Sequence, residues 1–357
     1  MKSLGKFPDP FIVEIAGQPD ALRRAAAGLA EQRDVLAAAG ETAAGRSVVF
    51  TGMGSSYDAC YPAITGLAER GVPAVMVDTA ELVHFRNGLL GPDTLVVAVS
   101  QSGESAEIVR LAGVLQGRSD RATLVSVTNG SANPLATVAD LALDTRSGRE
   151  VGPSTMTFAG SLAVVAAVGR VLGGDEPATT IQRVTGWADA AATALDGLLD
   201  RDDVPDRLLA WHADRPTTVL LGRGSARAAA EMGALTIKEA TGLAVESLET
   251  AQFRHGPLEL AGPRLAVMII ATERQTLDLD LGFASHLVSV GAAVSVITAG
   301  AGAVPEGAIA VDIGPISGPL VPAVSILPAQ LLAWRLSVRM GREPGAYYRA
   351  SKVTKVE

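Results

Sequence analysis

The sequence of 357 residues is poor in cysteine, in aromatic residues and in positive charge. Its single cysteine, Cys60, excludes an internal disulfide and any zinc site built from several thiolates. The net charge of −8 at pH 7 argues against a nucleic-acid partner, because phosphate backbones require clustered Lys and Arg. A small anion would therefore have to be bound by local hydrogen-bond donors rather than by the overall field.

Long apolar runs are missing too. The first residues, MKSLGKFPDPFIVEIAGQ, carry no apolar stretch typical of a signal peptide, and no run of 18 or more residues is apolar enough to span a bilayer. We therefore expect a cytoplasmic protein with no membrane partner. No spacing of His, Asp and Glu is typical of a metal site, so we expect neither a metal ion nor another cofactor.

What the sequence does have is a large apolar fraction, 48%, and an internal repeat. The segments SVVFTGMGS (47–55) and TTVLLGRGS (217–225) are offset by 170 residues, and three further apolar runs recur in the same order at nearly the same offset. Several ordered matches at a near-constant offset indicate two copies of one unit.

Each copy alternates short β-branched runs with longer segments of helical pattern. In the first copy these runs are SVVFTGM, AVMVDT, TLVVAVS, TLVSVT and DLALDT. They lack the polar alternation of a half-exposed sheet, which predicts an α/β protein with one parallel sheet of about five strands, flanked by helices, in each copy. The expected divisions are an N-terminal helical arm (1–40), domain 1 (41–175), connecting helices (176–208), domain 2 (209–345) and a C-terminal tail (346–357).

The most polar strand end is Ser100-Gln101-Ser102-Gly103-Glu104-Ser105, directly after TLVVAV. Hydroxyls and backbone amides at a strand-to-helix turn form a phosphate cradle that needs no positive charge. The alternative is a group of helix-capping serines with no ligand. A second turn, Gly52-Met53-Gly54-Ser55-Ser56, also ends a strand and could close the same crevice. Its GxG is weak evidence for a dinucleotide site because the third glycine of the motif is missing.

The second copy carries a different group of residues, with Lys238-Glu239 late in a helical pattern and His255 before Gly-Pro in a loop. A carboxylate and an imidazole can share proton transfer if they meet across a substrate. Taken alone, Glu239 is better explained as a surface helix residue, whereas His255 in its loop is the stronger candidate for a functional role. The remaining histidines lie in helical surroundings that favour packing or surface roles, and Cys60 suits a buried apolar position.

Several of these motifs resemble those of sugar isomerase (SIS) domains, where SQSGET is the phosphate loop. Lys238-Glu239, the run to His255-Gly256-Pro257 and the ending from Ser351-Lys352 to Val356-Glu357 are similar to the isomerase half of glucosamine-6-phosphate synthase. The likeness begins at FIVEIAGQPDAL and covers almost the whole chain. It implies two tandem SIS domains with flavodoxin-like three-layer folds.

The resemblance also implies a role for each matching residue. Glu239 would be the base between C1 and C2, His255 would assist ring opening from a neighbouring subunit, and Lys352 would face the carbonyl end of the sugar. A homodimer with shared active sites is therefore expected. The residues implied in holding the sugar phosphate and the rest of the substrate are Ser56, Ser100, Gln101, Ser102, Ser105, Glu150 and Ser351.

The synthase also has a glutaminase domain, to which no segment here corresponds. We therefore expect deamination of glucosamine 6-phosphate, or of a related amino-sugar or fructosamine phosphate, to a ketose phosphate. Met156 and Thr236 stand where the synthase pattern has lysines, which leaves the amine and the sugar substituent open. The alternatives are a phosphosugar isomerase without nitrogen chemistry and a non-catalytic sugar-phosphate sensor.

Overall fold

The computed structural model describes residues 9–300 and 302–356, and the chain divides into two compact units. Unit 1 comprises Met1–Pro19, Val151–Pro153 and Ala190–Tyr348. Unit 2 comprises Asp20–Glu150, Ser154–Asp189 and Arg349–Glu357. The tail that follows Tyr348 therefore belongs to the same unit as the first half of the chain.

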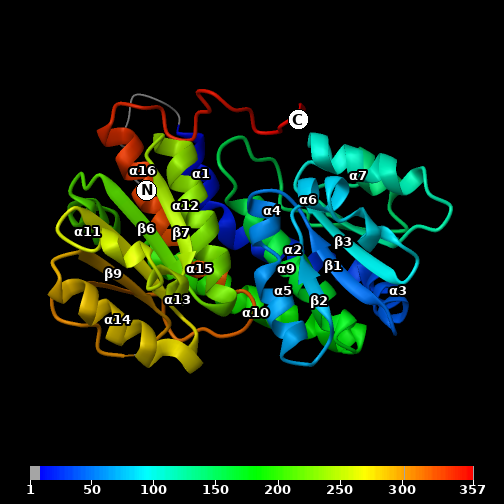
Figure 1. The fold of residues 1–357 in the computed structure, drawn as a ribbon, viewed down its shortest axis with the longest axis horizontal. Helices are drawn as coiled ribbons and strands as arrows, with labels where there is room; N and C mark the ends of the chain where they lie inside the picture. Colours follow the sequence, from blue (N-terminus) through cyan, green and yellow to red (C-terminus); the bar gives the residue numbers. More distant parts are fainter. Residues whose placement is uncertain (1–8, 301, 357) are drawn as a thin grey trace. The chain divides into compact units, whose positions relative to one another are not determined.

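Unit 2 is built on a five-stranded parallel sheet with the order β2-β1-β3-β4-β5 (Figure 1). Its strands are β1 (Ser47–Thr51), β2 (Ala74–Met76), β3 (Thr94–Ser100), β4 (Thr123–Thr128) and β5 (Leu141–Asp144). The order is that of flavodoxin-like folds, in which the chain reverses its direction of travel across the sheet between β1 and β3. Ligands of such sheets bind at this switch point, beyond the carboxyl ends of the strands.

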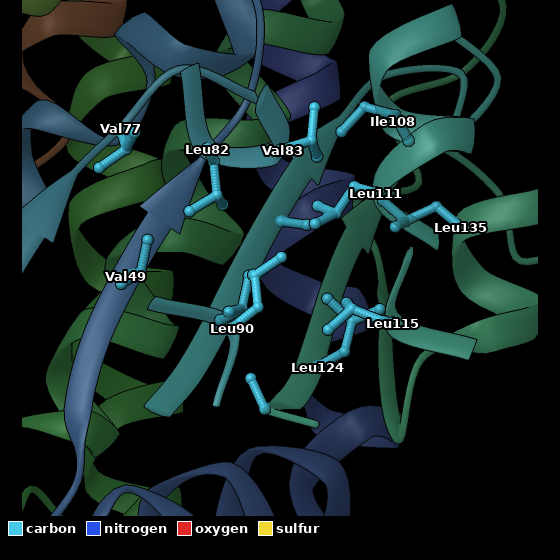
Figure 2. Packing of buried hydrophobic residues seen from close by; sticks show 13 residues of the cluster. Val49, Val77, Leu82, Val83, Leu90, Ile108, Leu111, Leu115, Leu124 and Leu135 are labelled. Atoms are coloured by element: carbon cyan, nitrogen blue, oxygen red, sulfur yellow. The ribbon is translucent and has the colours of Figure 1, made fainter. Parts of the chain in front are cut away.

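Helices cover both faces of the Unit 2 sheet. On one face, α6 (Thr79–His84), α7 (Ala106–Gln116) and α8 (Pro134–Val138) bury a cluster of leucine, isoleucine and valine side chains against the strands (Figure 2). The other face is covered by α3 (Arg33–Ala43), α5 (Tyr61–Ala68) and the almost wholly buried α9 (Met156–Leu172). Apolar burial on both faces explains why β3 has no exposed residue.

Unit 1 repeats the plan, with the sheet order β10-β9-β8-β6-β7. Its strands are β6 (Thr217–Gly222), β7 (Val245–Glu249), β8 (Leu265–Ala271), β9 (Ala293–Thr298) and β10 (Ile309–Asp312). One face packs on α13 (Thr250–Phe253) and α14 (Leu277–Ser289). The other packs on α11 (Asp203–His212) and α12 (Arg227–Thr241), which contact α16 (Leu327–Arg339). The remaining α-helices of the described residues are α1 (Pro10–Ala16), α2 (Gln18–Gly28), α4 (Ser55–Asp58), α10 (Pro177–Leu199) and α15 (Val321–Ser325).

The predicted α/β architecture with two parallel five-stranded sheets is confirmed. The expectation of strands buried on both faces holds for the central β3 and β8, whereas the edge strand β2 has no buried residue. An edge strand has only one neighbour and is covered less completely. The arm expected over residues 1–40 is helical from Pro10 onward. It does not form a separate part, because the chain up to Pro19 belongs to Unit 1 and the chain from Asp20 belongs to Unit 2.

One stretch, Val321–Arg339, has the length and hydropathy of a membrane span, so the expectation that no run of 18 or more residues is apolar enough was wrong. It comprises α15 and α16, and 83% of its most apolar window is buried inside the protein. A helix that is apolar on all sides and covered by α11 and α12 is the core helix of a packed unit.

Candidate active site

The loop between β3 and α7 is held in shape by its own serines. The Gly103 amide donates to Ser100 Oγ over 3.0 Å, and the Glu104 amide donates to Ser102 Oγ over 3.1 Å. Each hydroxyl accepts in these bonds and keeps its own proton as a donor. The loop amides therefore hold the two serine oxygens in place and leave both hydroxyl protons available for a ligand.

Gly103 is required at the centre of this loop for two reasons. Its φ of +64° lies in the left-handed region, which residues with a Cβ rarely adopt. A Cβ at this position would also lie 1.9 Å from Oδ1 of Asn133. That side chain cannot easily move, because it accepts from the Ala136 amide and donates to the Gly130 carbonyl. The Asn133 side chain thus caps α8 and at the same time supports the loop after β3.

Ser105 is the N-cap residue of α7, with the extended backbone typical of that position, yet its side chain makes no capping bond. This finding speaks against the capping-only interpretation for Ser105, although Ser100 and Ser102 do satisfy backbone amides of the loop. Ser56 lies in α4, beyond β1, with 7% of its surface exposed. Among the hydrogen bonds of the described residues, none involves the hydroxyl of Ser56 or Ser105 or the side-chain amide of Gln101. These groups follow the two strands that flank the switch point.

The Glu150 carboxylate is fully buried and accepts hydrogen bonds from several donors. The amide and hydroxyl of Thr155 donate to Oε1, the amide of Thr157 donates to Oε1, and the hydroxyl of Thr157 donates to Oε2. Because Thr155 and Thr157 begin α9, the carboxylate lies at the positive end of that helix dipole. Lys352 Nζ completes the group at 2.6 Å from Oε2.

Lys352 reaches Glu150 from the C-terminal tail, which has no helix or strand between residues 340 and 356. The Lys352 ammonium is also 3.5 Å from Ser154 Oγ, which accepts a hydrogen bond from Ser55 beyond β1. The structure thus brings together Glu150, Lys352 and the β1 turn within Unit 2. Ser351, expected to contact substrate, is exposed and donates instead to the Val353 carbonyl of its own tail.

Glu239 and His255 lie in Unit 1. Glu239 is half-buried on the last turn of α12, and His255 is exposed in the turn that follows α13. Gly256 adopts a φ of +118° immediately after this histidine, so the turn depends on a glycine there. Thr236, a position that departs from the synthase pattern, is fully buried and donates to the Met232 carbonyl of its own helix. Met156 begins α9, beside the threonines that bind Glu150.

Other candidates from the sequence have structural roles. Cys60 is fully buried, and burial raises the pKa of its thiol, so the reactive thiolate is disfavoured. His212 is buried with Nε2 3.1 Å from Thr218 Oγ1, and burial lowers its pKa. No group of three or more His, Cys, Asp or Glu within the described ranges is arranged to hold a metal ion.

Comparison with known proteins decides the family. Residues 43–169 and 213–340 each match the SIS domain. The chain belongs to the SIS domain family. The first SIS domain lies in Unit 2 apart from residues 151–153, and the second lies in Unit 1. Both matched ranges fall inside the domains expected from the internal repeat.

The curated relatives confirm the predicted homology to the isomerase half of the synthase. The chain is 27% identical over its whole length to glutamine–fructose-6-phosphate aminotransferase (isomerizing) from Pyrobaculum aerophilum, of which it covers 59%. A relative of the same name from Arabidopsis thaliana is 28% identical over 83% of the chain, which covers 44% of it. The chain therefore spans about half the length of these relatives.

Solved structures share the fold of this SIS protein. The C-terminal domain of glucosamine-fructose-6-phosphate aminotransferase from Francisella tularensis superposes with a TM-score of 0.83 and 22% identity, covering 95% of this chain and 98% of that one. Tagatose-6-phosphate ketose/aldose isomerase from Escherichia coli gives 0.81 and 21%, covering 98% and 100%. Glucosamine-6-phosphate deaminase from Thermotoga maritima gives 0.68 and 18%, covering 92% and 99%.

In the second SIS domain, charged side chains lie at the carboxyl ends of the strands and form ion pairs with one another. Arg223, which follows β6, donates from Nε to Asp280 at 2.7 Å and from Nη1 to Glu249 at 3.2 Å. Asp280 is 1% exposed, and burial raises its pKa although Arg223 opposes the shift. In the segment after β8, which includes the 3-10 helix Arg274–Thr276, Glu273 and Arg274 are the second and third residues after the strand, as Ser102 and Gly103 are after β3.

Sequence reasoning missed several residues of the Unit 2 site. Ser154 and Thr157, which contact Lys352 and Glu150, lie next to a glutamate that was identified, and their hydroxyls were the available signal. The Arg223 network could have been suspected from the repeat, because Arg223 replaces Met53 in the duplicated turn. Asn133 gave no such signal, since its contact with Gly103 joins two separate loops.

Proposed function

We propose that this SIS protein is an enzyme that interconverts the aldose and ketose forms of a sugar phosphate. We further propose that it releases ammonia when the substrate carries an amine at C2. The observation that carries the proposal is the hydroxyl-lined loop after β3, whose serine oxygens are held by loop amides, in the same unit as the docked tail lysine. A sensor would require the loop but would have no use for an ammonium held by a buried carboxylate.

The phosphate is assigned to the loop 100–105 and to Ser56. Neutral O–H groups and the amides at the start of α7 suit an anion, because an eleven-residue helix directs its positive end toward the loop. No Lys or Arg occurs in the loop itself, so selectivity for phosphate rests on hydrogen-bond geometry. This remote binding energy would fix the open-chain sugar for the chemical step.

The chemical step is assigned to Glu239 in the second SIS domain. Its carboxylate would take the proton from C2 of the open-chain aldose and return a proton to C1. For a 2-amino sugar, with a second proton passing from the amine nitrogen to O1, this leaves an imine at C2, which water hydrolyses to the ketone with release of ammonia. His255 would assist ring opening, and Lys352, once it leaves Glu150, would act at the carbonyl end, where an amine can form a Schiff base.

A second candidate is aldose–ketose isomerisation without nitrogen chemistry. The fold shared with tagatose-6-phosphate ketose/aldose isomerase favours it, while the fold shared with glucosamine-6-phosphate deaminase favours ammonia release. A fructosamine phosphate is the remaining substrate class. Isomerisation and deamination share the proton transfer at Glu239, and only deamination adds the hydrolysis that releases ammonia from C2.

We also propose a homodimer in the cytoplasm, with His255 serving the site of the neighbouring subunit. The exposed position of this histidine after α13 supports that arrangement, because its side chain is accessible to a second copy. Light scattering at micromolar concentration checks it. A monomer that is fully active under those conditions rules out a shared site.

The deciding assay incubates the purified protein with glucosamine 6-phosphate and measures ammonia and fructose 6-phosphate separately. Exchange of the C2 proton in deuterated water is followed in parallel by NMR. Release of both products supports the deaminase, whereas exchange without ammonia supports the plain isomerase. If no phosphosugar shows exchange, the sensor becomes the better explanation.

Glu239→Gln is the matching test of the base. The change keeps the size and shape of the side chain but removes the base, so sugar-phosphate binding should survive while turnover falls by at least about 100-fold. Glu246→Gln, an exposed glutamate on β7, serves as the control and should retain wild-type turnover. Proton exchange by Glu239→Gln at the wild-type rate would show that another residue is the base.

A further inference from the structure

The tail contacts Unit 2 at two more points beyond Lys352. The Ala106 amide, at the first residue of α7, donates to the Thr354 carbonyl over 3.0 Å. Lys355 Nζ then lies 3.2 Å from a carboxylate oxygen of Glu104. Both contacts are made to the loop after β3 or to the residue that immediately follows it.

These contacts link the position of the loop after β3 to the position of Lys352 in the tail. Glu104 belongs to the segment whose amides are fixed by Ser100 and Ser102, so its backbone moves with the proposed phosphate site. Lys352 and Lys355 are three residues apart, and three residues span at most about 10 Å. Any shift of the tail at Lys355 is therefore transmitted to the Lys352 ammonium over a very short length of chain.

We propose that Lys355 and Glu104 are positioning residues, forming a clasp that couples anion binding in the loop to the docking of the tail segment 353–355, which keeps Lys352 close to the loop whether or not its ammonium is on Glu150. The phosphate role of the loop is taken from the proposed function. An anion bound among the hydroxyls of the loop adds negative charge close to Glu104, which strengthens the attraction on the Lys355 ammonium. A bound sugar phosphate thereby holds the tail, and the tail in turn favours phosphate binding by the same factor.

The Lys355–Glu104 ion pair is weak because both side chains are exposed to solvent. The side chains of Lys355 and Glu104 are 68% and 42% exposed, and exposed pairs are strongly screened by water and salt. We therefore expect effects of about two- to five-fold that diminish as ionic strength rises. An effect of this size shifts the tail between docked and released states without locking it.

Limited trypsin digestion measures tail docking directly. Cleavage of the Lys352–Val353 bond requires the tail around it to detach from the loop after β3 and enter the protease, and mass spectrometry of the released peptide reports its rate. Inorganic phosphate or glucosamine 6-phosphate should slow this cleavage two- to five-fold in the wild type. Lys355→Ala should cleave faster than wild type without ligand and should lose most of the protection, whereas Lys355→Arg should keep it.

Three controls make the result specific to the clasp. Lys355→Glu should repel Glu104 and speed cleavage, and the double variant Glu104→Lys, Lys355→Glu should restore docking. Arg207→Ala removes an exposed ion pair with Asp203 on α11 of Unit 1 and should leave tail cleavage unchanged. Equal protection by phosphate in wild type and Lys355→Ala overturns the clasp.

Catalytic assays separate this proposal from the proposed function. With an active enzyme, Lys355→Ala should lower kcat/KM two- to five-fold at low salt, and Lys355→Arg should recover it. If wild type turns over no phosphosugar but phosphate still protects the tail only when a cation is present at position 355, the clasp stands and the proposed reaction fails. If turnover occurs but protection ignores position 355, the reaction stands and the clasp fails.

Discussion

The two SIS domains have the same strand order but differ in the side chains that lie at the carboxyl ends of their strands. After β3, the loop 101–105 offers hydroxyls and a glycine, and several of its donors have no partner among the described residues. After β8, the loop 272–276 has the same length but carries Glu273 and Arg274. Arg223, Glu249 and Asp280 fill the neighbouring strand ends with their own ion pairs.

The comparison shows that one fold can form either a strand end suited to binding an anion or a strand end satisfied by internal ion pairs. A strand end lined with neutral donors is poorly satisfied until a ligand arrives, which makes it suitable for binding. A strand end that contains a paired arginine and two carboxylates is satisfied internally and disfavours a phosphate anion through its acidic groups. We expect the first domain to hold the anion and the second to supply reacting groups from α12 and the turn after α13.

The largest effect should come from removing the glycine that distinguishes the first loop. Gly103→Ala would place a Cβ 1.9 Å from Asn133 Oδ1 at a positive φ, so we expect the free energy of unfolding to fall by about 3 kcal/mol or more and phosphate binding to be lost. Urea denaturation and calorimetry check this.

Gly130→Ala is the matched control for Gly103→Ala. It has a φ of +102° but no atom within 4 Å of the added Cβ, so it shares the backbone strain without the clash. Its cost should be only about 1 to 2 kcal/mol. If both variants are equally destabilised, the contact with Asn133 is not what requires Gly103.

A smaller effect should follow from removing one hydroxyl of the first loop. Ser102→Ala should weaken binding of glucosamine 6-phosphate by about 1 to 3 kcal/mol, because the lost O–H would donate to a charged oxygen. Glu273→Ala at the matching position of the second domain should leave the affinity unchanged. Calorimetry measures both, and equal binding of glucosamine and its 6-phosphate by the wild type would contradict the assignment of the loop.

The smallest effect concerns the ion pairs of the second domain and depends on pH. Burial raises the pKa of Asp280 above its ordinary value of 3.8, so the folded state binds this proton more tightly than the unfolded state. The stabilising contribution is complete below the unfolded pKa and is lost as the pH rises through the folded pKa. The unfolding free energy of wild type should therefore fall relative to Asp280→Asn as the pH rises from about 4 through the raised pKa of the folded state.

The control for that titration is Asp278→Asn, an exposed residue on the same helix, which should show no such trend. Urea denaturation across the pH range gives both differences. A gap between wild type and Asp280→Asn that widens in favour of wild type as the pH rises would mean that Arg223 outweighs burial at Asp280.

The strands and the loop after β3 could be predicted closely because their causes are local. Runs such as TLVVAVS and TLVSVT are β3 and β4 residue for residue, since unbroken β-branched runs admit few other structures. The remaining features arise from contacts between distant segments. Residues 151–153 belong to Unit 1, where the amides of Val151 and Gly152 donate to buried Glu14. No local sequence pattern predicts that this segment packs with Unit 1.

The same reason separates the predicted site residues from the missed ones. Glu150 could be proposed from a motif, but its four donors from Thr155 and Thr157 depend on how the chain enters α9. The bond from the Ala106 amide to Thr354 uses a backbone carbonyl, which every residue has and no sequence pattern marks. The placements of Glu239 and His255 in catalysis remain predictions.

The hydrogen bonds around Glu150 determine whether Lys352 can leave this carboxylate and return to it. Four of the five donors to this carboxylate come from Thr155 and Thr157, so the buried charge stays solvated by the protein when Lys352 departs. If Lys352 acts on the sugar as proposed, it can leave Glu150 and return after product release while the threonine donors keep the carboxylate in the same position. The binding position for the lysine would then be ready again for each turnover without any rearrangement of α9.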